Sequence, residues 1–218
     1  MRDTSSTAGL WLGTGSALLA AALIFHGPPD PDMTVQMQHV AENHGRWAMV
    51  HWAAAAALFL MSGAGFLTLL ARAEGAHVNA PYGAWVFLAL GALLTISTAV
   101  AEAGVVSVAA ASGDQASFDA WWAFSSGMAN GFFALAIATG RIAFAEYGAD
   151  GSRLPSWASM IGTAAGFLSA LGWMLGTQLD IWIGGPIWLI STLVMCLWLT
   201  WLGLSIWTRA GAPQSVTA

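Results

Sequence analysis

Long apolar stretches separated by short polar segments dominate the pattern of this sequence. Each stretch is close to 20 residues or longer, enough to cross a hydrocarbon core about 30 Å thick. The runs are continuous, unlike the alternating segments of about 10 residues in a transmembrane β-barrel. The pattern therefore predicts an all-α integral membrane protein, a six-transmembrane-helix bundle with spans at about residues 9–26, 46–71, 82–111, 117–144, 156–178 and 181–207.

Proline and acidic residues mark the boundaries of the first spans. Pro28 and Pro29 end the first one because proline cannot continue a helix. Asp32 offers an N-cap for a polar helix that can run unbroken into the second span. No small-residue cleavage site follows the first apolar run, so we expect a retained helix rather than a signal peptide. The predicted organisation is a short cytoplasmic amino-terminal segment (1–8), one transmembrane domain (9–209) and a disordered tail (210–218). The transmembrane domain includes a polar segment at 27–45.

Composition and charge agree with a membrane protein. The chain is 57% hydrophobic and 8% charged, with a mean hydropathy of +0.67, whereas about a quarter of the residues of a soluble domain are charged. The net charge of −5 and the absence of a basic tract exclude a nucleic-acid partner. The lone Cys196 lies inside the last apolar run and behaves as a small hydrophobe.

The arginines predict the orientation, because positive charge collects in cytoplasmic loops. Cytoplasmic amino and carboxyl termini leave only Arg46 on the outer side, and the tryptophans, Trp47 among them, then fall into belts at the two interfaces. We expect a bacterial inner (plasma) membrane protein with the His-rich segment 27–45 outside. The arginines that this orientation places on the cytoplasmic side are Arg2, Arg72, Arg141, Arg153 and Arg209.

Ionisable groups inside the spans are the best candidates for function, because they are costly to bury in a membrane. Four of the five histidines lie between His26 and His51. At 1.5 Å per residue, His51 is about 9 Å and Glu102 about 15 Å below the outer surface. Independent helices thus place polar groups in one outer layer, in which we expect His26, His44, His51 and Glu102, supported by Asn130, Ser126 and Gln178.

The spacing of the histidines limits how they could hold a metal or cofactor. His44 and His51 are seven residues apart, about 10.5 Å of helical rise, too far to bind one ion together. A metal would therefore take ligands from separate helices: His51, Glu102, and His26 or His44. Imidazole can bind copper, zinc or haem iron, and an added carboxylate suits zinc, manganese or iron, so copper, zinc or iron are the expected metals. A b-type haem would take His51 with His26 or His44 as axial ligands.

The leading hypothesis is a redox or metal-handling membrane subunit that holds a metal or b-type haem in this layer. One alternative is a small proton-coupled transporter in which Glu102 and His51 titrate, although no convincing pair of broken helices is evident in the sequence. Another is a structural subunit of a larger membrane complex. The expected partners are the lipid bilayer and other membrane subunits or a second copy. The sequence contains no nucleophile elbow, no His-Glu-x-x-His motif and no phosphate-binding glycine loop, which argues against hydrolysis.

Overall fold

The computed structural model describes residues 4–27, 29–30, 32–76, 79–127 and 131–210. Every regular element in this part of the chain is a helix, which confirms the all-α prediction. The elements are α1 (Thr4–His26), α2 (Met33–Glu42), α3 (His44–Ala73), α4 (Tyr82–Ala101), η1 (Glu102–Val106), α5 (Ser107–Ser112), α6 (Gln115–Ser125), α7 (Phe132–Tyr147), α8 (Ser156–Trp173), η3 (Met174–Gln178) and α9 (Gly184–Ala210).

Five helical stretches in the described residues are long and apolar enough to cross a membrane. They are Thr4–His26, His44–Ala73, Tyr82–Ser112, Ser156–Gln178 and Gly184–Arg209. Two of these stretches contain a segment of π-helix, η1 in the third and η3 in the fourth. These five stretches match five of the predicted spans, with boundaries that differ by a few residues.

The predicted span at 117–144 is not one continuous helix. This region forms two shorter helices, because α6 ends at Ser125 and α7 begins at Phe132. The cap of α7 is Gly131, with a φ of 83° in the left-handed region, which only glycine adopts readily. The apolar composition of the segment resembles a single span, but its serines and glycines interrupt the helix.

The polar segment before α3 is a helix of its own. The Oδ1 atom of Asp32 accepts hydrogen bonds from the backbone N–H groups of Thr34 and Val35 at 2.8 and 3.3 Å, so the predicted N-cap is confirmed. α2 ends at Asn43 and α3 begins at His44. A helix running unbroken from the polar segment into the second span is therefore ruled out.

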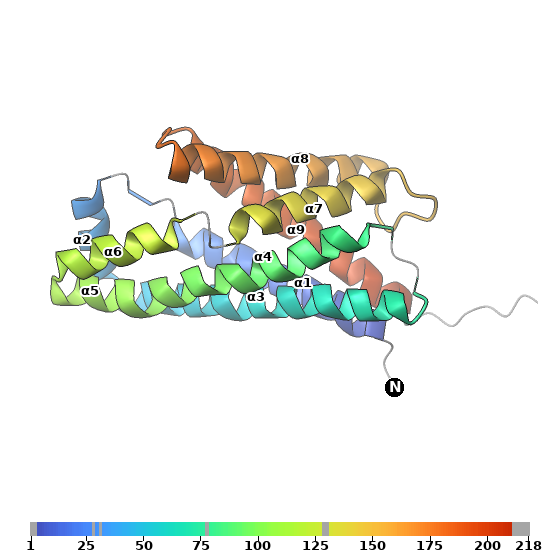
Figure 1. Ribbon diagram of the computed structural model, residues 1–218, viewed down its shortest axis with the longest axis horizontal. Helices are drawn as coiled ribbons and strands as arrows, with labels where there is room; N and C mark the ends of the chain where they lie inside the picture. Colours follow the sequence, from blue (N-terminus) through green and yellow to red (C-terminus); the bar gives the residue numbers. More distant parts are fainter. Residues whose placement is uncertain (1–3, 28, 31, 77–78, 128–130, 211–218) are drawn as a thin grey trace, which may run out of the picture.

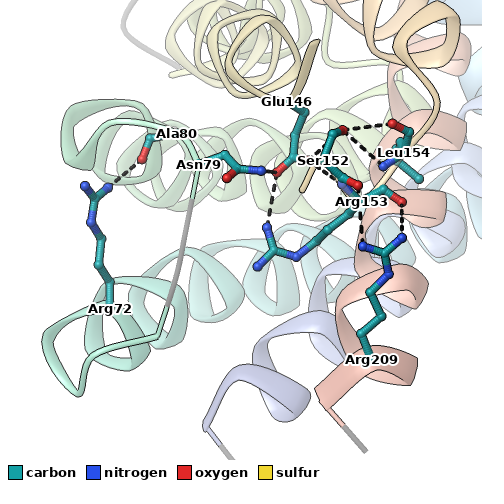
Figure 2. A network of polar contacts seen from close by, with 8 residues as sticks. All are labelled: Arg72, Asn79, Ala80, Glu146, Ser152, Arg153, Leu154 and Arg209. Atoms are coloured by element: carbon teal, nitrogen blue, oxygen red, sulfur yellow. Dashed lines mark hydrogen bonds and ion pairs between the residues drawn. The ribbon is translucent and has the colours of Figure 1, made fainter. Parts of the chain in front are cut away.

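The long helices form a closed ring in sequence order. Around this ring, α1 packs against α3, α3 against α4, α4 against α7, α7 against α8, α8 against α9, and α9 against α1. The short helices α2, α5 and α6 gather at one end of the bundle, at the left of Figure 1. We call this end the α2/α6 end. The opposite end, where Arg72, Arg153 and Arg209 lie, is called the arginine end (Figure 2).

Small residues let neighbouring helices in the ring approach closely. A Cβ atom on Gly203 of α9 would lie 2.3 Å from the backbone N of Gly13 in α1. A Cβ on Gly166 of α8 would lie 2.4 Å from the backbone N of Gly140 in α7. Such contacts between backbones are a common way of packing helices in membranes, where apolar side chains gain little from leaving lipid.

Candidate functional site

His26 and His51 meet at the α2/α6 end, where the last residue of α1 faces the first turns of α3. Their ring centroids are 5.0 Å apart. The indole of Trp47 lies against both, with centroid distances of 4.7 Å to His26 and 4.8 Å to His51. His51 and Trp47 are buried. Two of the predicted site histidines are thus brought together, around a tryptophan that the sequence placed at the interface.

Both histidines are oriented by backbone carbonyls. Nδ1 of His51 lies 2.9 Å from the carbonyl oxygen of Trp47, and Nδ1 of His26 lies 2.5 Å from that of Gly27. Because a carbonyl oxygen can only accept, each Nδ1 carries the proton and donates. In the neutral rings Nε2 is then the free acceptor.

Glu102 is buried at the junction of α4 and η1. Its Oε2 accepts a hydrogen bond from Nε1 of Trp47 at 3.3 Å, and its Oε1 accepts one from the hydroxyl of Ser125 in α6. Within the described residues, the hydrogen bonds to Glu102 thus come only from neutral donors. A buried carboxyl group in such surroundings needs either a proton or a cation to balance its charge.

A cavity of about 1130 Å³ lies inside the ring at this end. Its wall includes Glu102, His26 and His51, and it also takes residues from α6, α8 and α9. Most of the other lining side chains are apolar or aromatic. The site is therefore a roomy chamber whose wall is more apolar than polar and also carries carboxyl, imidazole, amide and hydroxyl groups.

The backbone is irregular where it borders the cavity. Glu102 begins the π-helical segment η1, and Gly176 and Thr177 of the second such segment, η3, also line the wall. Ser125 and Ser126 line it just where α6 ends. Single π-helical turns occur frequently at functional sites. The backbone thus departs from regular α-helix at three places around the same chamber.

The remaining predicted site residues are only partly brought into this site. Ser126 lines the cavity, and its carbonyl oxygen accepts a hydrogen bond of 3.1 Å from Nε2 of the exposed Gln178. His44 is exposed and is not part of the wall. Its backbone oxygen instead accepts a hydrogen bond from Ser107. Asn130 lies outside the described residues.

The arrangement does not favour the predicted metal or haem. In the part of the chain that the structure describes, no group of three or more His, Cys, Asp or Glu side chains could hold a metal ion. Two axial imidazoles bind haem iron from opposite faces of the porphyrin, which must lie between the rings. The rings of His26 and His51 instead lie edge to face at an interplanar angle of 71°, with centroids 5.0 Å apart and Trp47 against both. A haem between them does not fit.

Sequence reasoning missed the residues that connect the site. Trp47 is four residues before His51 and hence on the same face of α3, a signal that identifies it in retrospect. Ser125, the neighbour of the predicted Ser126, is the serine whose hydroxyl donates to Glu102. The aromatic group formed by Phe132, Trp173 and Trp188 in the cavity wall has no local signature, because it joins three helices.

The arginine end is closed by a network around Glu146 of α7 (Figure 2). Arg153 forms an ion pair with Glu146 at 3.2 Å, and its backbone N–H donates to the same carboxylate. Asn79 and Ser152 donate to it as well. Arg209 of α9 donates to the carbonyl oxygens of Ser152 and Arg153. These bonds tie α7 and α9 to the loops before α4 and α8.

No family model matches this chain, and neither a curated protein nor a solved structure matches it. The argument about function therefore rests on the residues of the cavity.

Proposed function

We propose that this protein takes up a small organic molecule from the outer side of the membrane into the cavity of its helix ring, as a binding protein or carrier of the proton-coupled type. Glu102 is the titrating group, and His26 and His51 are the polar groups that orient the molecule. The observation that carries the proposal is the placement of the buried Glu102 in the wall of a chamber of about 1130 Å³.

The character of the wall supports this proposal. Ligand sites in proteins are concave and mostly apolar, with a few convergent polar groups that fix the orientation of the ligand. The cavity has this composition. Interrupted helices in membrane carriers also border their ligand sites, and the gap between α6 and α7 lies at this wall. An ionisable residue inside a membrane span is itself a mark of a pathway for ions or substrates.

The proposed orientation follows from the charges at the two ends. Arg153 and Arg209 are joined at the arginine end and Arg72 lies at the same end, apart from them (Figure 2); we assign this end to the cytoplasm by the positive-inside rule. In this arrangement α6 and α7 together make a sixth, interrupted crossing, both termini are cytoplasmic, and the cavity opens to the outer side of a bacterial inner membrane.

Cysteine labelling tests whether the cavity is reached from outside. The single cysteine, Cys196, is buried and free, so a Cys196→Ala background gives an unreactive chain. Intact cells that carry Thr98→Cys, in the cavity wall, are treated with a membrane-impermeant thiosulfonate. Mass spectrometry then measures the modification of the cysteine. Ser159→Cys, buried near the start of α8 at the arginine end, is the control.

We expect modification of Thr98→Cys from the outer side and none of Ser159→Cys. A Thr98→Cys protein that reacts only in inside-out vesicles reverses the orientation, and one that reacts in neither overturns the proposal of an accessible cavity.

Infrared difference spectroscopy between low and high pH tests whether Glu102 titrates. We expect a protonated-carboxyl band that disappears as the pH is raised and that is absent in Glu102→Gln. The exposed Glu42 of α2 provides a matched control, because Glu42→Gln should keep the band. Identical spectra of the wild type and Glu102→Gln at every pH would remove Glu102 from the proposed proton coupling.

A further inference from the structure

We propose that the molecule held in this cavity is an organic ammonium ion, whose positively charged nitrogen lies beside Glu102 and whose apolar body lies against the aromatic wall. This inference rests on the proposed function and adds the chemical class of the ligand.

The charges that line the cavity are the first argument. Four carboxyl groups belong to the wall, those of Asp30, Glu102, Asp119 and Asp180. Glu102 is buried, whereas Asp119 and Asp180 are exposed. None of the arginines in the described residues belongs to the wall, and the chain contains no lysine. An entering cation thus meets acidic groups at the rim before it reaches the buried carboxyl group.

The basic groups of the wall do not cancel this preference. His26 and His51 each donate from Nδ1 to a backbone carbonyl oxygen, so in their neutral form they offer only the Nε2 lone pair to the cavity. A lone pair accepts a hydrogen bond from an ammonium N–H group but gives an anion nothing. The histidines are therefore compatible with a cationic ligand.

The surroundings of Glu102 are the second argument. Its carboxyl oxygens accept hydrogen bonds from Trp47 and Ser125, which orient the group without neutralising it. When an ammonium ion binds, it supplies the missing charge, and the proton of the neutral carboxyl group leaves. One proton is released for each cation bound, so the exchange leaves the net charge of the site unchanged.

The aromatic wall argues for an organic cation rather than a metal ion. Phe132, Trp173 and Trp188 form one group, with ring centroids 5.0 to 5.9 Å apart, and Trp122 of α6 also lines the cavity. Aromatic faces attract ammonium groups and provide apolar surface. A bare metal ion would instead need a cage of oxygen or nitrogen ligands, and the volume far exceeds that of an ion.

Binding of the benzylammonium ion to the full chain in mild detergent at neutral pH tests the inference. Equilibrium dialysis compares this cation with the similarly sized neutral benzyl alcohol and the anion phenylacetate. We expect saturable binding of the cation, at least ten-fold tighter than that of the other two compounds, with release of about one proton per cation to a pH indicator. Equal binding of all three compounds, or no binding of the cation, would overturn the inference.

Variants then locate the cation. Glu102→Gln should weaken cation binding at least ten-fold, whereas Glu42→Gln, at the same end of the molecule but outside the wall, should bind like the wild type. Glu102→Asp keeps the charge and should keep the preference for the cation, which guards against a folding defect in the glutamine variant. Tight cation binding by a folded Glu102→Gln protein would contradict the assignment.

The outcomes separate this inference from the proposed function. If Thr98→Cys is labelled from outside but the cation is not preferred, the cavity remains a ligand site and its charge class is wrong. If Thr98→Cys is inaccessible from both sides, both proposals fail.

Discussion

Nε1 of Trp47 donates a hydrogen bond of 3.3 Å to Oε2 of Glu102, and this contact joins α3 to the junction of α4 and η1. The two residues are 55 positions apart in the chain. The ring of Trp47 also contacts His26 and His51. One indole therefore links His26, His51 and Glu102, the three groups to which we assign roles in ligand binding.

Replacement of Trp47 by phenylalanine should destabilise the protein. The change keeps an aromatic ring but leaves one carboxyl oxygen of the buried Glu102 without its donor. Loss of one partner of a buried hydrogen bond costs about 1–3 kcal/mol. Thermal unfolding in mild detergent measures the loss. Trp121→Phe is the control, because Trp121 is 39% exposed, and we expect little change there. Equal unfolding temperatures for the two variants would show that the indole N–H contributes nothing.

The crossing of α4 and α7 should be sensitive to a single methyl group. A Cβ on Gly91 would lie 2.5 Å from the backbone N of Leu135, so Gly91→Ala must push the helices apart, and overpacking of this kind costs about 1–3 kcal/mol. Gly83 is in the same helix and has open space around the equivalent position. Gly83→Ala should therefore be neutral or stabilising, by up to about 1 kcal/mol.

Thermal unfolding of these two alanine variants, measured side by side, tests the packing of the ring. A Gly91→Ala protein as stable as Gly83→Ala would contradict the close approach of α4 and α7. Gly91 does not line the cavity. We therefore expect Gly91→Ala to reduce cation binding only in proportion to the fraction of protein that is unfolded.

The network at the arginine end should contribute to stability in a salt-dependent manner. Glu146→Gln removes the ion pair with Arg153, whose side chain is 19% exposed against 4% for Glu146. Breaking a fully buried pair costs about 3–5 kcal/mol, and the partial exposure of Arg153 should reduce this to about 1–3 kcal/mol. The exposed Glu74, at the same end, provides the control variant Glu74→Gln.

Unfolding of Glu146→Gln, Glu74→Gln and the wild type is compared at low and at high salt. We expect the gap between Glu146→Gln and the wild type to narrow as salt screens the pair. Equal stability of Glu146→Gln and the wild type at low salt would show that the ion pair does not stabilise this end.

The sequence predicted the helices well because length and apolarity are local properties. It failed at 117–144, where composition resembles a continuous span but Gly131 requires a left-handed backbone. It also failed to separate α2 from α3 at Asn43. In both places the helix ends through the backbone geometry of one or two residues, which an average over about 20 positions does not register.

The candidate site was predictable in part. The sequence singled out His26, His51 and Glu102 because ionisable residues stand out in apolar spans, and all three line the cavity. His44 was predicted to belong to the site because it is close in sequence to the other histidines, but in the structure it is exposed. The metal and haem hypothesis depended on how side chains from separate helices meet, which spacing along one helix does not determine.

The sequence by itself determined an all-α protein with long apolar helices and singled out His26, His51 and Glu102, because the cost of placing backbone and charge in lipid allows few alternatives. Only the tertiary structure decided that the helices close into a ring, that Trp47 joins Glu102 to the histidines, and that a cavity remains between them. The reason is physical. Burial in lipid acts on each segment separately, whereas a cavity and its hydrogen bonds depend on the relative positions of residues that are far apart in the chain.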